Sequence, residues 1–90
     1  MRHRRRELVR GKPSFTAVEW SALVAQYEGR CAYCGERGLL QVDHRTPLAR
    51  GGANTIDNIL PACGRCNLKK WLMTEAEFRA LLDREHQQDR

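Results

Sequence analysis

Apolar residues recur with a helical period near both ends of the sequence. Over residues 16–28 they follow the i, i+3, i+4, i+7 spacing that places side chains on one face of a helix. Thr16 and Glu19 have the spacing of a capping box, and Gly29 stands just past the end of the pattern. We therefore expect a helix here with one buried apolar face. Its apolar residues are Trp20, Leu23, Val24 and Tyr27.

A second capping-box pattern, at Thr74 and Glu77, predicts a final helix. The apolar stripe of that helix consists of Phe78, Leu81 and Leu82. A shorter helix is expected to start near Cys66, between the last strand and the final helix. Its inner face is expected to carry Leu68, Trp71 and Leu72, and its outer face Lys69 and Lys70.

Two short apolar segments between these helices predict strands, at residues 39–44 and 58–62. The loop over 46–57 is rich in turn residues, so we expect the two strands to pair antiparallel. The first strand ends in Asp43 and His44. Successive side chains of a strand point to opposite faces. These two residues therefore serve one site only if the strand is distorted at its end or if they approach the site from different sides.

The 90 residues include four cysteines, arranged as two C-x-x-C pairs. A single domain of this size has a thin core and usually needs disulfides, a metal or a partner to be stable. The spacing is typical of a four-thiolate zinc site. Disulfides are the alternative, but we find no signal peptide and expect the reducing cytoplasm, which favours the metal. The predicted zinc ligands are Cys31, Cys34, Cys63 and Cys66.

Positive charge is concentrated in two parts of the chain, whose net charge is +5. Residues 1–12 alone carry +5, and residues 30–70 carry +4, while the flanking segments are acidic. This distribution favours a polyanionic partner such as nucleic acid. We expect residues 1–13 to form a mobile basic arm, and the alternative is that this arm is only a solvated tail. No apolar run is long enough for a membrane helix.

Polar residues between the cysteine pairs carry the candidate chemistry. Hydrolysis of a phosphodiester needs a base that works near neutral pH and a cation that takes the charge growing on the phosphate. His44 is the natural base, because the unperturbed pKa of histidine is about 6.5. Asp43 and the side-chain carbonyl of Asn67 are oxygen donors of the kind that magnesium prefers. Asn58 would hold His44, or the loop around it, through hydrogen bonds.

Together these motifs resemble the HNH endonucleases of the four-cysteine type, over residues 31–70. Besides the cysteines, the similarity depends on Asp43, His44, Arg45, Gly51, Gly52, Asp57, Asn58, Asn67 and Lys70. The resemblance implies an α+β fold, a small ββα-metal finger with a four-cysteine zinc site and flanking helices. It places a nuclease domain at 14–90, after the basic arm, with its zinc and catalytic core at 31–70.

The resemblance also implies a role for each polar residue of the motif. His44 corresponds to the general base, and Asn58 to the asparagine that orients it. Asp43 and Asn67 correspond to the ligands of the catalytic metal. The last motif position is often histidine in the family, and the asparagine found here favours Mg²⁺ or Mn²⁺ over softer ions.

The sequence thus predicts a metal-dependent endonuclease that hydrolyses DNA, in a cytoplasmic protein of phage or bacterial origin. It would work alone, as a dimer, or beside a larger phage or restriction machinery. The expected contacts to DNA phosphates are Arg45, Arg50, Arg65, Lys69 and Lys70. His3 and His86 are given no role. The alternative is a non-catalytic zinc finger that binds nucleic acid, which would need only the cysteines and the basic residues.

Overall fold

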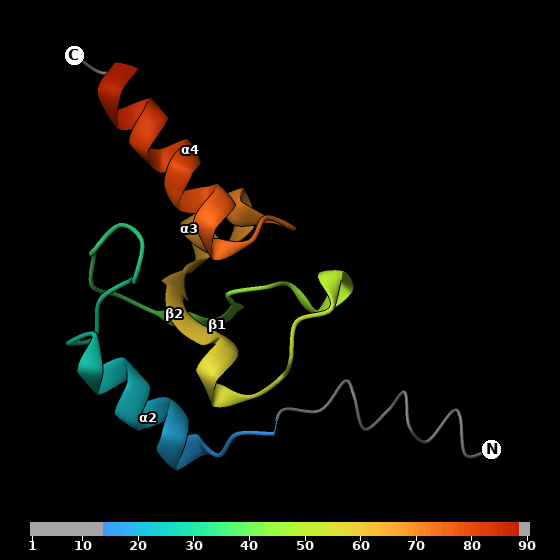
Figure 1. Cartoon of the computed structure of the whole chain (residues 1–90). Helices are drawn as coiled ribbons and strands as arrows, with labels where there is room; N and C mark the ends of the chain where they lie inside the picture. The colour runs from blue at the N-terminus through green and yellow to red at the C-terminus, as the bar shows by residue number, and fades with distance from the viewer. Residues whose placement is uncertain (1–13, 89–90) are drawn as a thin grey trace.

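A two-stranded antiparallel sheet lies at the centre of the molecule (Figure 1). The computed structural model describes residues 14–88, and in it β1 (Leu40–His44) pairs with β2 (Ile59–Cys63). Each strand lies within one residue of the predicted segment, and the antiparallel pairing is confirmed. Four of the five residues of β2 are buried, so this strand forms the floor of the core. The basic arm predicted at residues 1–13 lies outside the described residues.

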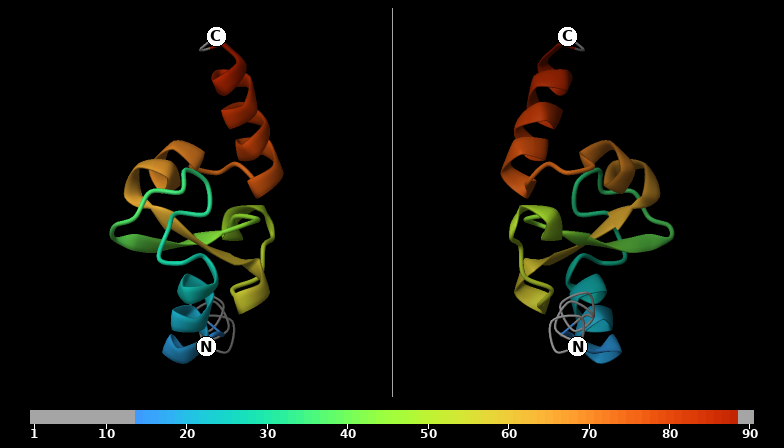
Figure 2. Two further views of the ribbon diagram at one scale, coloured as in Figure 1. Left: turned by 90° about the vertical axis from the view of Figure 1, so that its left-hand side faces the viewer. Right: turned by 90° about the vertical axis from the view of Figure 1, so that its right-hand side faces the viewer.

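The helix α2 (Ala17–Gln26) starts where the capping pattern predicts. The hydroxyl of Thr16 accepts a hydrogen bond from the amide of Glu19, and the Glu19 carboxylate accepts one from the amide of Thr16, so the capping box is confirmed. The four apolar residues of this helix are only half-buried, and no residue of α2 is fully buried. The reason is its position at one end of the molecule, where it is covered on a single side (Figure 2).

The helix α4 (Glu75–Gln88) lies at the opposite end from α2 (Figures 1 and 2). Thr74 and Glu77 form the predicted reciprocal pair of hydrogen bonds at its start. Phe78 is fully buried and belongs to the core cluster, and Leu81 and Leu82 pack against that cluster. The apolar stripe predicted for this helix is therefore confirmed.

The short helix α3 (Gly64–Lys70) corrects the predicted orientation. Leu68, Trp71 and Leu72 are exposed, whereas the expected outer residue Lys70 is fully buried. The helix starts two residues before Cys66 because the sulfur of Cys63 accepts a hydrogen bond from the Cys66 amide and caps it. With Cys66 turned inward to the cysteine cluster, Lys70 follows it four residues later on the same face.

Trp71 ends α3 in a strained backbone conformation. Its φ is 51° and its ψ is −115°, a region that favours glycine. A residue with a side chain is destabilised there by on the order of 1–3 kcal/mol. The Trp71 side chain is 71% exposed, so burial of the indole does not offset this strain. Packing within residues 14–88 does not explain why a large side chain occupies the position.

The cysteines themselves form much of the small hydrophobic core. The cluster of buried residues consists of Cys31, Ala62, Cys66 and Phe78. Tyr33 packs against this cluster, with its ring edge-on to Phe78 at a centroid distance of 4.9 Å. No helix of residues 14–88 is long and apolar enough to cross a membrane.

The loop between the strands contains two short 3₁₀ helices, η1 (Leu48–Arg50) and η2 (Ile56–Asn58). Gly51 ends η1 in the left-handed conformation, with a φ of 90°. Gly52 has a different constraint, because a Cβ atom there would overlap the backbone carbonyl of Thr46. The chain can therefore pass Thr46 closely only with glycine at position 52.

We expect Gly52→Ala to lower the free energy of unfolding by about 1–3 kcal/mol, because the loop backbone must shift to admit the methyl group. Gly64→Ala is the matched control. A Cβ at Gly64 makes only an ordinary contact with Gln41, so this variant should be neutral or slightly more stable. Urea denaturation of both variants measures the difference. Equal stability of Gly52→Ala and the wild type would contradict the close approach.

Candidate active site and metal centre

Four sulfur atoms converge where the segment before β1 meets the junction of β2 and α3. The Sγ atoms of Cys31, Cys34, Cys63 and Cys66 all lie within 4.8 Å of one another, and all four cysteines are free. The sulfurs of Cys34 and Cys63 are 3.8 Å apart. In a tetrahedral site with Zn–S bonds of about 2.3 Å, neighbouring sulfurs are about 3.8 Å apart. The cluster therefore fits a structural zinc ion.

Backbone amides point at two of these sulfurs. The amides of Tyr33 and Cys34 donate to Cys31 Sγ at 3.4 and 3.5 Å, and the amide of Cys66 donates to Cys63 Sγ at 3.4 Å. Burial raises the pKa of the Cys31 thiol, but the amides outweigh burial and lower that pKa to about 7. Burial raises the pKa of the Cys66 thiol well above its ordinary value. The pKa values of the Cys31 and Cys66 thiols thus lie far apart, and a dication at the centre of the cluster would favour the thiolate form of both.

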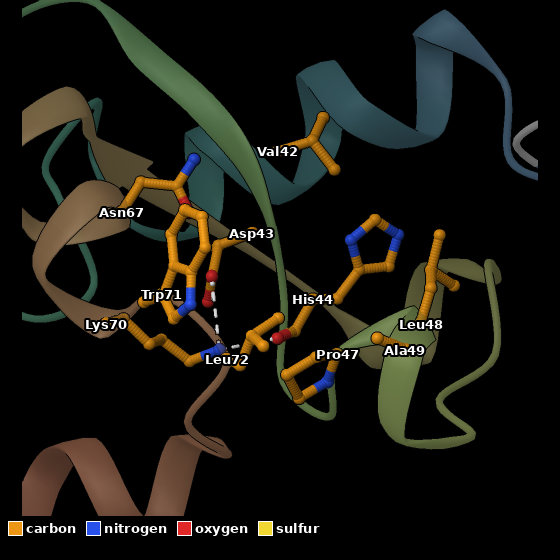
Figure 3. Close-up of a pocket in the computed structure, with 10 residues that line it drawn as sticks. All are labelled: Val42, Asp43, His44, Pro47, Leu48, Ala49, Asn67, Lys70, Trp71 and Leu72. Atoms are coloured by element: carbon orange, nitrogen blue, oxygen red, sulfur yellow. Dashed lines mark hydrogen bonds and ion pairs between the residues drawn. The ribbon is translucent and has the colours of Figure 1, made fainter.

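An open cleft of about 350 Å³ lies beside β1 and α3 (Figure 3). Three of the four residues predicted to form the catalytic site line it, namely Asp43, His44 and Asn67. In Figure 3 the carboxylate of Asp43 and the imidazole of His44 lie on opposite sides of β1, as the alternation of a regular strand requires. The two side chains therefore reach the cleft from different sides.

Asp43 is buried and held by two partners. Its Oδ1 is 3.3 Å from the ammonium nitrogen of Lys70, and its Oδ2 accepts a hydrogen bond of 2.6 Å from the hydroxyl of Tyr33. Lys70 also donates to the backbone carbonyl of His44 at 2.7 Å. Burial, followed by the hydrogen bond and charge of Asp43, raises the pKa of Tyr33 well above its ordinary value, so Tyr33 stays a donor. The carboxylate is thus fixed in place before any ligand arrives.

His44 has a partner that the sequence did not indicate. Its Nε2 lies 2.8 Å from Oδ1 of Asn54, an amide oxygen of the loop. With that oxygen as acceptor, Nε2 carries the proton and Nδ1 is the basic nitrogen of the neutral ring. The contact therefore selects one tautomer and one orientation of the imidazole.

Asn58 braces the loop and makes no hydrogen bond to His44. Its Oδ1 accepts from the amide of Thr46 at 3.0 Å, and its Nδ2 donates to the carbonyls of Thr46 and Ala53 at 3.0 and 2.7 Å. Ala53 directly precedes Asn54, so the side chain of Asn58 is linked to the imidazole of His44 through these two loop residues. Of the two roles expected for Asn58, the observed contacts fit that of holding the loop.

Asn67, on α3, donates its amide hydrogen to Oε1 of Gln41 at 2.9 Å. This bond orients the amide group of Asn67. The side-chain carbonyl oxygen of Asn67 takes no part in the bond and lies on the side of Asp43 (Figure 3). A carboxylate and an amide oxygen on one cleft are hard donors, which fit Mg²⁺ or Mn²⁺.

Comparison with known proteins identifies a family that matches the central part of the chain. The sequence model of the family described as HNH endonuclease matches residues 31–71, which include both cysteine pairs and every residue of the cleft discussed above. Residues 31–71 belong to the HNH endonuclease family. The ββα-metal arrangement of this HNH domain consists of β1, β2 and α3 with the cysteine cluster beside them.

Two relatives carry endonuclease names. YoqL, a protein of the SPbeta prophage of Bacillus subtilis (strain 168) whose name assigns it to the HNH endonucleases, is 31% identical over 70 residues. The CRISPR-associated endonuclease Cas9 of Corynebacterium diphtheriae is 36% identical over 66 residues. The alignments cover 66% and 69% of this chain, but only 30% of YoqL and 6% of Cas9. The chain therefore spans less than a third of the length of either relative.

The basic residues of the HNH domain that were expected to contact phosphates are all in ion pairs. The pairs are Arg45–Glu75, Arg50–Glu77, Arg65–Glu36, Lys69–Glu85 and Lys70–Asp43. The Arg50 hydrogen bond lowers the pKa of Glu77 to about 2. The Arg45–Glu75 pair is half-buried. Exposed pairs contribute only about 0–1 kcal/mol, so Arg50, Arg65 and Lys69 can exchange a carboxylate for a phosphate. Lys70 cannot, and its expected contact to DNA is wrong, because its ammonium is buried against Asp43.

Two residues of the HNH domain site, Tyr33 and Asn54, were not found from the sequence, and a third, Lys70, was given a different role there. Lys70 lies four residues after Cys66, so helical spacing from the metal cluster was a usable signal for its inward position. Tyr33 lies inside the first C-x-x-C pair, and Asn54 lies in the loop. No local pattern links these last two residues to Asp43 or His44.

Proposed function

We propose that this chain is a metal-dependent endonuclease that hydrolyses phosphodiester bonds of DNA. The observation that carries the proposal is the placement of Asp43, His44 and Asn67 on one cleft of an HNH domain. In this proposal His44 Nδ1 takes a proton from the attacking water while Asn54 holds Nε2. The non-catalytic zinc finger remains the alternative.

Asp43 and Asn67 would hold the divalent ion through their side-chain oxygens. When bound, a Mg²⁺ or Mn²⁺ ion supplies positive charge to the scissile phosphate and to the departing 3′ oxygen. Lys70 and Tyr33 keep the Asp43 carboxylate in position from below the cleft. The products would carry a 5′ phosphate and a 3′ hydroxyl. One such cleft cuts one strand at a time. A double-strand break would therefore need two copies of the protein or two successive binding events.

The test is cleavage of supercoiled plasmid in a series of Mg²⁺ and Mn²⁺ concentrations. We expect His44→Ala to cut about 10²–10⁴-fold more slowly than the wild type, because the base is lost. His86→Ala is the matched control, since His86 is an exposed histidine of α4, and it should cut at the wild-type rate. A wild type that binds DNA without cutting it in any metal, or a His44→Ala variant that cuts equally fast, would favour the non-catalytic alternative.

A further inference from the structure

Trp71 stands at the wall of the candidate active site without an internal partner. Its backbone is strained, its side chain is 71% exposed, and its indole N–H makes no hydrogen bond within residues 14–88. Leu68 is 72% exposed and Leu72 is 48% exposed, and both line a hollow of the surface together with Trp71. These three residues form what we call the α3 edge.

The α3 edge separates two hollows of the surface. Trp71 and Leu72 line the cleft that holds Asp43 and His44. They also line a second hollow of about 510 Å³, together with Leu68 and Gln41. Asn67 touches both hollows, so the edge is continuous with the candidate metal site. In Figure 3 the indole lies on the same side of β1 as the carboxylate of Asp43.

We propose that Trp71 packs against a base or sugar of the DNA strand whose phosphate enters the candidate active-site cleft. This inference rests on the proposed function and names a contact of the same site. A strand entering the cleft brings its apolar sugar and the flat faces of its bases next to its phosphate, and aromatic side chains stack on such faces without regard to sequence. Leu68 and Leu72 extend the apolar contact along the strand.

Charge on the chain supports a nucleic acid as the occupant. The net charge of +5, which residues 1–12 supply, attracts a polyanion to the chain as a whole. Of the lysines next to the edge, Lys70 does not meet the strand because it is buried against Asp43, and Lys69 would meet a phosphate only by releasing Glu85, 2.6 Å away. The exposed surface beside the cleft is thus aromatic and aliphatic, which suits the uncharged parts of a nucleotide.

The experiment measures DNA binding in a His44→Ala background, so that no substrate is cut. Fluorescence anisotropy of a labelled single-stranded oligonucleotide, whose base faces are accessible, gives the affinity, and thermal unfolding gives the stability. We expect Trp71→Gly to weaken binding about 5- to 150-fold, the loss of one stacking contact, while it keeps or raises the unfolding temperature by relieving the strain. Trp71→Phe should retain most of the affinity, and Trp71→Leu less of it. Trp20→Phe, on α2, is the control and should bind like its parent.

A second readout uses intrinsic fluorescence of the Trp20→Phe variant, in which Trp71 is the remaining tryptophan. Adding the unlabelled single-stranded oligonucleotide should quench and shift its emission. Unchanged affinity of Trp71→Gly, with unchanged emission, would overturn the inference. So would a loss of self-association in sedimentation with unchanged DNA affinity, since the edge would then contact protein. These binding measurements need no cleavage, so they stay decisive even where the wild type proves inactive on plasmid.

Discussion

Chelation of the metal is expected to unfold the domain, the largest effect that we predict. Cys31 and Cys66 belong to the buried core cluster, whereas Cys34 is exposed and Cys63 half-buried, so the ion would tie the hydrophobic core to the surface at its edge. Structural zinc contributes on the order of 10 kcal/mol or more to the folding of small domains. A strong chelator should therefore abolish the helical signal in circular dichroism, and an excess of Zn²⁺ should restore it.

The same result is expected for Cys66→Ser, because Cys66 is buried and the substitution replaces one of the four clustered sulfur atoms. Ser21→Ala, at an exposed position of α2, is the control and should fold as the wild type does. A chelated wild type with its full helical signal and a cooperative thermal transition would count against the zinc site.

Asp43→Ala is expected to lose both stability and activity. Lys70 is fully buried, so removal of Asp43 leaves an ammonium group in the interior with the carbonyl of His44 as its remaining contact. Breaking a buried ion pair from one side destabilises by about 3–5 kcal/mol. Under the proposed function the variant also lacks one ligand of the catalytic ion. Urea denaturation and plasmid cleavage measure the two losses separately.

The double variant Asp43→Ala/Lys70→Met separates structure from catalysis. Replacement of both partners by apolar groups removes the unpaired charge, so much of the stability should return. Cleavage should not return, because the metal ligand is still missing. Asp83→Ala, an exposed acid of α4, is the control and should change stability by no more than about 0.5 kcal/mol. Recovery of cleavage in the double variant would show that Asp43 does not hold the ion.

The interpretation of the charge pattern changes with the structure. The central stretch has an excess of basic residues in sequence, yet each predicted phosphate contact has an acidic partner in space, most of them from α4. The glutamates of α4 lie outside residues 30–70 in the sequence, so the sequence assigns them to an acidic flanking segment. Attraction of DNA by these residues therefore requires that surface ion pairs open, at a small cost for the exposed ones.

Local sequence patterns were enough to predict the elements whose causes are local. Thr16 with Glu19 and Thr74 with Glu77 cap their helices through bonds between residues three positions apart, so spacing alone predicts them. The paired cysteines, the two strands and the motif residues Asp43, His44 and Asn67 were found in the same way. Their chemistry is carried by residue type and short spacing, which one sequence displays in full.

The contacts between side chains around the cleft follow from the folded arrangement of the elements and not from local sequence. Tyr33 reaches Asp43 over 10 residues, Asn54 reaches His44 over 10, and Lys70 reaches the carbonyl of His44 over 26. These contacts depend on how α3 is rotated and on where the loop closes. The rotation of α3 is set by the sulfur cluster, which turns Cys66 and Lys70 inward and Trp71 outward, because burial of the metal ligands outweighs burial of the apolar residues of so short a helix.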